Sequence, residues 1–134
     1  MIAGLFILLG CNKESNRQLR IPEHPSFFKN ESDMYRQVQL ALDKLAPGRK
    51  LQEIQSVSYI DSRNASYAFI FYRSGSKESN VVMRQQYAGN KVVAYESVTC
   101  EGASCECKVR TVINNQGDVT MDCSCPSCTK LVNN

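Results

Sequence analysis

The chain has 134 residues, of which 43% are hydrophobic and 22% charged, a composition typical of a globular protein rather than of a disordered or fibrous one. Its net charge of +3 arises from 16 basic and 13 acidic residues that do not cluster, which argues against a nucleic-acid partner. Seven cysteines are a high count for this length, and six of them lie between positions 100 and 128.

The first ten residues, MIAGLFILLG, are apolar and uncharged, and the chain becomes polar directly after Cys11. About ten apolar residues are too few to span a membrane, which takes about 20, but they match the core of a signal peptide. We therefore expect residues 1–10 to be a targeting segment that takes no part in the fold.

The end of this segment carries a short motif, Leu8, Leu9, Gly10 and Cys11. It resembles the lipobox of bacterial lipoproteins, in which the cysteine is acylated and the chain is cut just before it. The resemblance implies a lipid anchor at Cys11 that ties the protein to a membrane of the cell envelope, facing the periplasm or the exterior. Two or more acyl chains anchor a protein stably where one does not. Six cysteines then remain, an even number.

Residues 11–32 are polar, contain two prolines and lack a sustained apolar period, so they predict a flexible linker. Phe27 and Phe28 can still dock on the domain that follows. His24, the single histidine of the chain, is expected in this solvated segment. Without a second histidine, a histidine-based metal site or a protease dyad is disfavoured.

An apolar stripe at helical spacing begins just after the linker. Its members are Met34, Val38, Ala41, Leu42 and Leu45. Ser32 or Asp33 can cap the start of this helix, and Pro47 with Gly48 ends it.

Four segments beyond the helix predict strands, at residues 51–60, 66–73, 80–87 and 91–99. The second, SYAFIFYR, is apolar on both faces, so we expect it inside the sheet with the helix across one side. Gly89 and Asn90 predict a two-residue hairpin turn. Connections this short make neighbouring strands antiparallel. Residues 33–99 are therefore expected to form an α+β fold, one helix packed on an antiparallel meander of four strands.

This order of helix and strands is similar to the cystatin-like arrangement. The resemblance is one of topology and implies no function by itself. A peptidase inhibitor is correspondingly a weak analogy, because no segment matches the inhibitory loops of cystatins.

Residues 100–134 predict a Cys-rich β-hairpin and a tail that belong to the same domain. If residues 115–117 form a three-residue loop with Gly117 in the left-handed conformation, Cys107 lies opposite Cys125. Opposed residues are near the reach of a disulfide, so we predict a bridge between these two. A two-residue loop would instead oppose Cys105 and Cys128.

Three chemistries compete for the six cysteines of this region, which are Cys100, Cys105, Cys107, Cys123, Cys125 and Cys128. Zinc favours paired C-x2-C segments, and only Cys125 and Cys128 have that spacing. An extended C-x-C holds its thiols about 7 Å apart, so it chelates only where the backbone bends. CPSC also resembles the active-site loop of glutaredoxins, which needs a following helix that is not expected here. Export favours the third chemistry, structural disulfides.

The sequence thus predicts a small cell-envelope lipoprotein whose disulfide-stapled domain binds or scaffolds a partner without catalysis. No nucleophile, general base or phosphate-binding loop is recognisable, and no cofactor is expected. The alternative is a zinc-binding module that uses the C-terminal thiolates.

Overall fold

The computed structural model describes residues 27–62, 64–102 and 105–134. The predicted signal peptide, the lipidation site Cys11 and His24 lie outside them. No helix within these ranges combines the length and the hydropathy needed to cross a bilayer. The elements in chain order are α2 (Glu31–Leu45), β1 (Glu53–Asp61), β2 (Ala65–Ser74), β3 (Lys77–Ala88), β4 (Lys91–Glu101), β5 (Val109–Ile113), β6 (Val119–Cys123) and β7 (Thr129–Asn133).

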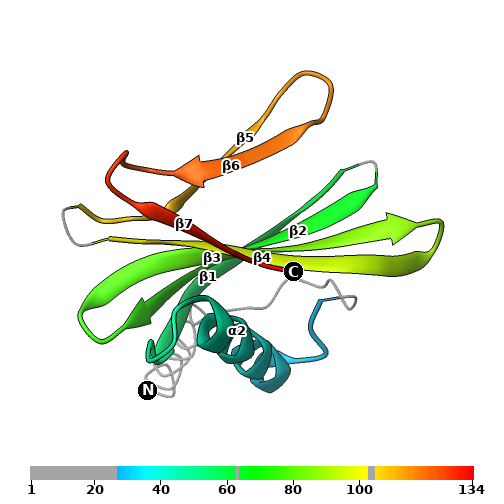
Figure 1. Ribbon diagram of the computed structural model, residues 1–134. Coiled ribbons are helices and arrows are strands. Elements are labelled where there is room, and N and C mark those ends of the chain that lie inside the picture. Colours follow the sequence, from blue (N-terminus) through cyan, green and yellow to red (C-terminus); the bar gives the residue numbers. More distant parts are fainter. Residues whose placement is uncertain (1–26, 63, 103–104) are drawn as a thin grey trace, which may run out of the picture.

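The elements form three layers (Figure 1). The middle layer is an antiparallel sheet with strand order β1-β2-β3-β4-β7. Helix α2 covers one face of this sheet, and the β5–β6 hairpin lies over the other. The α+β class and the meander are confirmed, but the sheet has five strands rather than four. The predicted tail forms the fifth, because Leu131 of β7 packs against the helix-side core.

Helix α2 buries the predicted apolar stripe and ends at Leu45, before Pro47, as expected. Its start differs from the prediction, because Asn30 rather than Ser32 or Asp33 is the N-cap. The Asn30 side chain accepts a hydrogen bond from the backbone N–H of Asp33 at 2.8 Å. In return the backbone N–H of Lys29 donates to the Asp33 carboxylate, and this bond lowers the pKa of Asp33. The cap therefore lies one residue ahead of the helix, and the side chains of Asn30 and Asp33 accept from the N–H groups of Asp33 and Lys29.

The core between α2 and the sheet also takes in the end of the predicted linker. Phe27 and Phe28 are 6% and 5% exposed and belong to this core. The ring of Phe27 stacks on that of Tyr59, with 5.7 Å between the ring centroids. Residues 27–32 are therefore part of the folded domain, which begins ahead of the predicted boundary at residue 33.

Strand β2 shows why a segment can be apolar on both faces. Ala68, Ile70 and Tyr72 pack in the helix-side core, whereas Tyr67 and Phe69 pack in a second core under the hairpin. The strand is internal, between β1 and β3, as predicted. Each face of the sheet thus carries apolar side chains, which the helix covers on one side and the hairpin on the other.

Candidate functional site

The hairpin has the register predicted from its turn. Val109 pairs with Cys123 and Ile113 with Val119. The backbone N–H of Asn114 donates to the carbonyl of Asp118 at 3.0 Å, and Gly117 has a φ of 85°. The three-residue loop with a left-handed glycine is therefore confirmed.

One face of the hairpin is turned onto the sheet. Its residues Val109, Val119 and Met121 pack in the same core as Val82 and Val98 of the sheet. Because side chains alternate along a strand, Cys123 shares the parity of Val119 and Met121 and also points towards the sheet. The hairpin face that carries Cys123 thus lies between the hairpin and the sheet rather than towards solvent.

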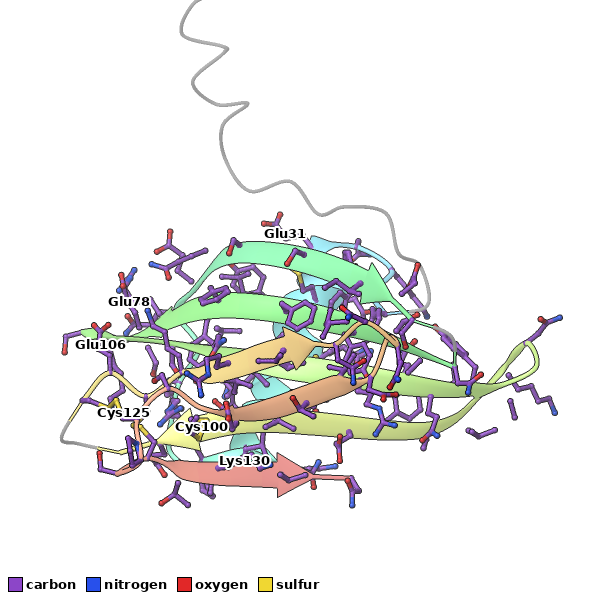
Figure 2. The ribbon with its side chains drawn as sticks, turned by 90° about the horizontal axis from the view of Figure 1, so that it is seen from above. Glu31, Glu78, Cys100, Glu106, Cys125 and Lys130 are labelled. Atoms are coloured by element: carbon purple, nitrogen blue, oxygen red, sulfur yellow. A yellow bond between two sulfur atoms is a disulfide. The ribbon has the colours of Figure 1, made fainter. Side chains whose placement is uncertain are left out.

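Three disulfides join the hairpin to the sheet and to the segment that leads into β7, so all six cysteines of the described residues are crosslinked. Figure 2 shows Cys100 and Cys125 at one end of the molecule, near Glu78 and Glu106. The pairs are Cys100 with Cys123, Cys105 with Cys125, and Cys107 with Cys128. The prediction of disulfides is supported, and the chain is a small disulfide-stapled domain.

The predicted bridge between Cys107 and Cys125 is wrong, although the register behind it is right. The ladder ends at the pair of Val109 with Cys123. Beyond it Cys125 begins a tight turn, in which the N–H of Cys128 donates to the Cys125 carbonyl at 3.1 Å. That turn moves Cys125 out of line with Cys107 and brings Cys128 to it. Cys107 therefore pairs with Cys128, and Cys125 pairs with Cys105.

A buried amide holds the base of the hairpin on the sheet. Asn80, on β3, is 2% exposed and donates from Nδ2 to the Val109 carbonyl at 2.9 Å. Its Oδ1 accepts from the Val109 N–H at 2.7 Å. The Ser79 hydroxyl adds a bond to the Cys107 carbonyl at 3.1 Å. One side chain thus satisfies both backbone groups of a buried residue in the neighbouring layer.

Two of the bridges lie against each other and bring Cys105, Cys107, Cys125 and Cys128 into one group, the sulfur cluster. Sγ of Cys105 is 3.4 Å from Sγ of Cys128 and 3.9 Å from Sγ of Cys107. The Sγ atoms of Cys105, Cys125 and Cys128 all lie within 4.8 Å of one another. At this spacing the cluster can hold a metal ion when its sulfurs are not bonded to each other.

Gly102 lies directly against the sulfur cluster. A Cβ atom at this position would be 2.7 Å from Sγ of Cys107 and 3.4 Å from Cα of Cys128. Real Cβ atoms do not approach other atoms so closely, so only glycine fits unless the bridge moves. The chain thus needs a residue without a side chain where it leaves β4 for the hairpin.

Gly102→Ala is expected to lower the free energy of unfolding by about 1 to 3 kcal/mol, because the added methyl group overpacks the bridge of Cys107 with Cys128. Urea unfolding checks this value. In a Cys107→Ala/Cys128→Ala background the same substitution should cost clearly less, since the sulfur that it meets is gone. An equal loss in both backgrounds would contradict the contact.

A cleft of about 480 Å³ opens between the hairpin loop and the sheet, and we call it the tip cleft. It combines apolar surface with charged and amide groups from both layers. The Arg84 guanidinium on its floor lies 3.4 Å from the Glu96 carboxylate, and Nε of Arg84 is buried without a hydrogen-bond partner in the part of the chain described. The lining residues are Ile60, Asp61, Ser62, Asn64, Ala65, Tyr67, Arg84, Gln86, Ile113, Gln116, Gly117, Asp118 and Val119.

Sequence reasoning found the cysteines but missed the residues around them. Asn80 stands at the start of a predicted strand, where an amide has low β-propensity, and that mismatch was its signal. Gly102 between a strand and a cysteine segment carries a weaker signal of close backbone approach. The sequence carries no such signal for Arg84, because an arginine in a strand is ordinarily solvated.

Comparisons with known proteins add no relative to this description: no family model, no curated protein and no solved structure matches the chain.

Proposed function

We propose that the protein is an exported, lipid-anchored binding domain of the cell envelope that holds a ligand or partner and catalyses nothing. In this proposal Cys11 carries the lipid, and the disulfide-stapled domain stands outside the cytoplasm. The tip cleft is the part of the domain that receives the ligand.

The observation that carries this proposal is the set of three disulfides. Disulfides persist in exported proteins and are rare where thiols are kept reduced. Six cysteines in three bridges also leave Cys11 as the odd one, which agrees with its use in a lipid thioether.

The tip cleft supports binding in preference to catalysis. Clefts of a few hundred Å³ that mix apolar walls with a few polar groups are typical of ligand sites. Tyr67 and Ile113 supply apolar surface, whereas Arg84, Asp61 and Asp118 supply charge of both signs. The thiols of the described residues are used in bridges, and the single histidine, His24, lies outside those residues, so no Cys–His or Ser–His pair occurs among them.

Cys11→Ser is expected to move the full chain, expressed in a bacterial host, from the membrane fraction to the soluble fraction, because the serine cannot form the lipid thioether. Fractionation followed by intact mass measures both the location and the attached lipid. The wild-type mass should rise on reduction by the six hydrogens of three opened bridges.

Asn16→Ser is the matched control, since it changes a nearby polar residue of the same segment and should leave the protein on the membrane. A wild-type chain that is soluble in the cytosol, with Met1 retained and all thiols free, would overturn the proposal. Turnover by the purified protein that a single substitution abolishes would overturn its non-catalytic part.

A further inference from the structure

We propose that the sulfur cluster is a redox-switched zinc site: when its two bridges are reduced, the thiolates of Cys105, Cys107, Cys125 and Cys128 bind one Zn²⁺. Reoxidation closes the bridges and releases the ion. The inference goes beyond the proposed function, because it concerns the other end of the hairpin and holds whatever the tip cleft binds.

The sulfur positions already approximate a tetrahedral zinc site. Zn–S bonds of about 2.3 Å place the sulfurs of a tetrahedron about 3.8 Å apart. The two contacts of Cys105, at 3.4 Å to Cys128 and 3.9 Å to Cys107, are close to this distance. A bonded pair needs to open from about 2 Å to about 3.8 Å, which asks each sulfur to move by about 1 Å. Side-chain rotation can supply that movement.

The backbone around the cluster is bent in the way that chelation needs. On an extended strand the two thiols of a C-x-C segment are about 7 Å apart, too far for one ion. Here Cys105 and Cys107 lie ahead of β5, outside the ladder, and their sulfurs are 3.9 Å apart. On the other side Cys125 and Cys128 belong to a C-x2-C turn closed by a hydrogen bond of 3.1 Å. Cys105, Cys125 and Cys128 therefore offer three sulfurs within 4.8 Å of one another, and Cys107, 3.9 Å from Cys105, is the fourth ligand that the proposal adds.

The cluster is accessible, and charged groups of both signs surround it. A cleft of about 430 Å³ is lined by Cys105, Cys107, Lys77, Glu78, Glu106 and Cys100, among others, so a reductant and an ion can reach the sulfurs. The two carboxylates disfavour added negative charge, and Lys77 offsets part of this effect. Four thiolates around Zn²⁺ carry two net negative charges, which a nearby ammonium group stabilises. The ammonium of Lys77 donates to the Gly102 carbonyl at 3.5 Å, beside the cluster.

The third bridge is set apart from this chemistry. Cys100 is 1% exposed, the least of the six cysteines, although it lines the same cleft and lies in the same core as Cys107. Its sulfur is therefore the last of the six that a reductant can reach. The bridge with Cys123 keeps the hairpin attached to β4 while the other two bridges open. The fold can thus persist in both states of the switch.

The reaction balances with a dithiol as the reductant. Each of the two bridges takes up two electrons and two protons from one dithiol, which leaves as its own disulfide. Zn²⁺ then displaces the protons of the four thiols as it binds. In the reverse direction two equivalents of a disulfide oxidant take four electrons from the thiolates and four protons from solvent, both bridges reform, and the ion is released.

The test uses the full chain, oxidised or reduced with dithiothreitol that is then removed under anaerobic conditions. Zinc is added, and the bound metal is measured by mass spectrometry, together with alkylation mapping of the thiols. We expect no zinc on the oxidised chain and one per reduced chain, with the four cluster cysteines protected from alkylation and the Cys100 bridge intact. Cobalt in place of zinc should give the intense visible absorption of a tetrahedral thiolate site.

Two double variants remove equal numbers of cysteines. Cys105→Ser/Cys125→Ser should weaken zinc binding at least about tenfold. Substitution of residues that only hydrogen-bond to metal ligands already lowers metal affinity by that factor. Cys100→Ser/Cys123→Ser keeps the four proposed ligands, so it should still bind one zinc per reduced chain and lose less affinity than the first variant, although the hairpin is no longer tied to β4. Mapping of the protected thiols in the wild type needs no variant, so it decides the question if a variant fails to fold. Absence of zinc on the reduced chain, unchanged binding by the first variant, or reduction of all three bridges together would overturn the switch.

Discussion

Asn80→Ala is expected to lower the free energy of unfolding by about 2 to 4 kcal/mol, because it leaves the buried N–H and carbonyl of Val109 without partners. Urea unfolding with the bridges intact measures this loss. Faster hydrogen exchange at the Val109 amide should accompany it, since that amide loses its acceptor.

Asn115→Ala is the matched control, because that asparagine lies exposed in the hairpin loop and its loss should change stability by less than about 0.5 kcal/mol. Asn80→Asp provides a second check. The carboxylate cannot donate to the Val109 carbonyl, whereas its protonated form can, so burial should raise its pKa and the variant should lose stability as pH rises through that value. Equal losses for Asn80→Ala and Asn115→Ala would show that the amide does not hold the hairpin.

Removal of the buried bridge by Cys100→Ala/Cys123→Ala is expected to cost about 3 kcal/mol or more. Its sequence separation of 23 residues corresponds to a loop-closure contribution of about 3 kcal/mol in the chain-entropy account. The loss of packed sulfur from the core under the hairpin adds to this value. Thermal and urea unfolding of the variant measure the sum.

A comparison with the bridge of Cys105 with Cys125 separates the loop-closure contribution from the packing contribution. Its sequence separation is 20 residues, so its loop-closure contribution differs from that of the buried bridge by only about 0.1 kcal/mol. Cys105→Ala/Cys125→Ala should nevertheless cost less, because both of these cysteines are only half-buried. If the two variants lose the same stability, burial of the Cys100 sulfur contributes nothing measurable.

Local patterns were sufficient for most of the sheet and the helix. The stripe from Met34 to Leu45 and the turn at Gly89 depend on neighbours a few residues away, and both are as predicted. The register of the hairpin followed in the same way from Gly117. Such features are read from the sequence because the interactions that stabilise them are local.

Features that depend on contacts between layers were not predicted. Strand β7 has five residues and a single half-buried leucine, so its pattern is too short to distinguish a strand from a tail. The position of the hairpin over the sheet was implied only by the two apolar faces of β2, and the prediction assigned a cover, the helix, to one side of the sheet. The turn that begins at Cys125 lies beyond the end of the ladder, which is why a correct register gave an incorrect bridge.

The candidate sites show the same division. The six cysteines were identified by residue type and spacing, whereas the tip cleft joins residues of β1 to β3 to the loop between β5 and β6, which is distant in the sequence. Nothing in the sequence around Arg84 indicates which loop will lie above it.

The attachments between hairpin and sheet are unevenly distributed along the hairpin. The disulfides and the bonds from Asn80 and Ser79 reach Cys107, Val109 and Cys123, all at its base. Beyond the base, the hairpin is held by noncovalent contacts, which are the packing of Val119 and Met121 and the bond from the Lys130 ammonium to the Met121 carbonyl at 3.2 Å. Contacts of this kind can be rearranged while the disulfides stay closed, so an adjustment of the loop at Gln116 to a bound ligand would require no change in the crosslinks.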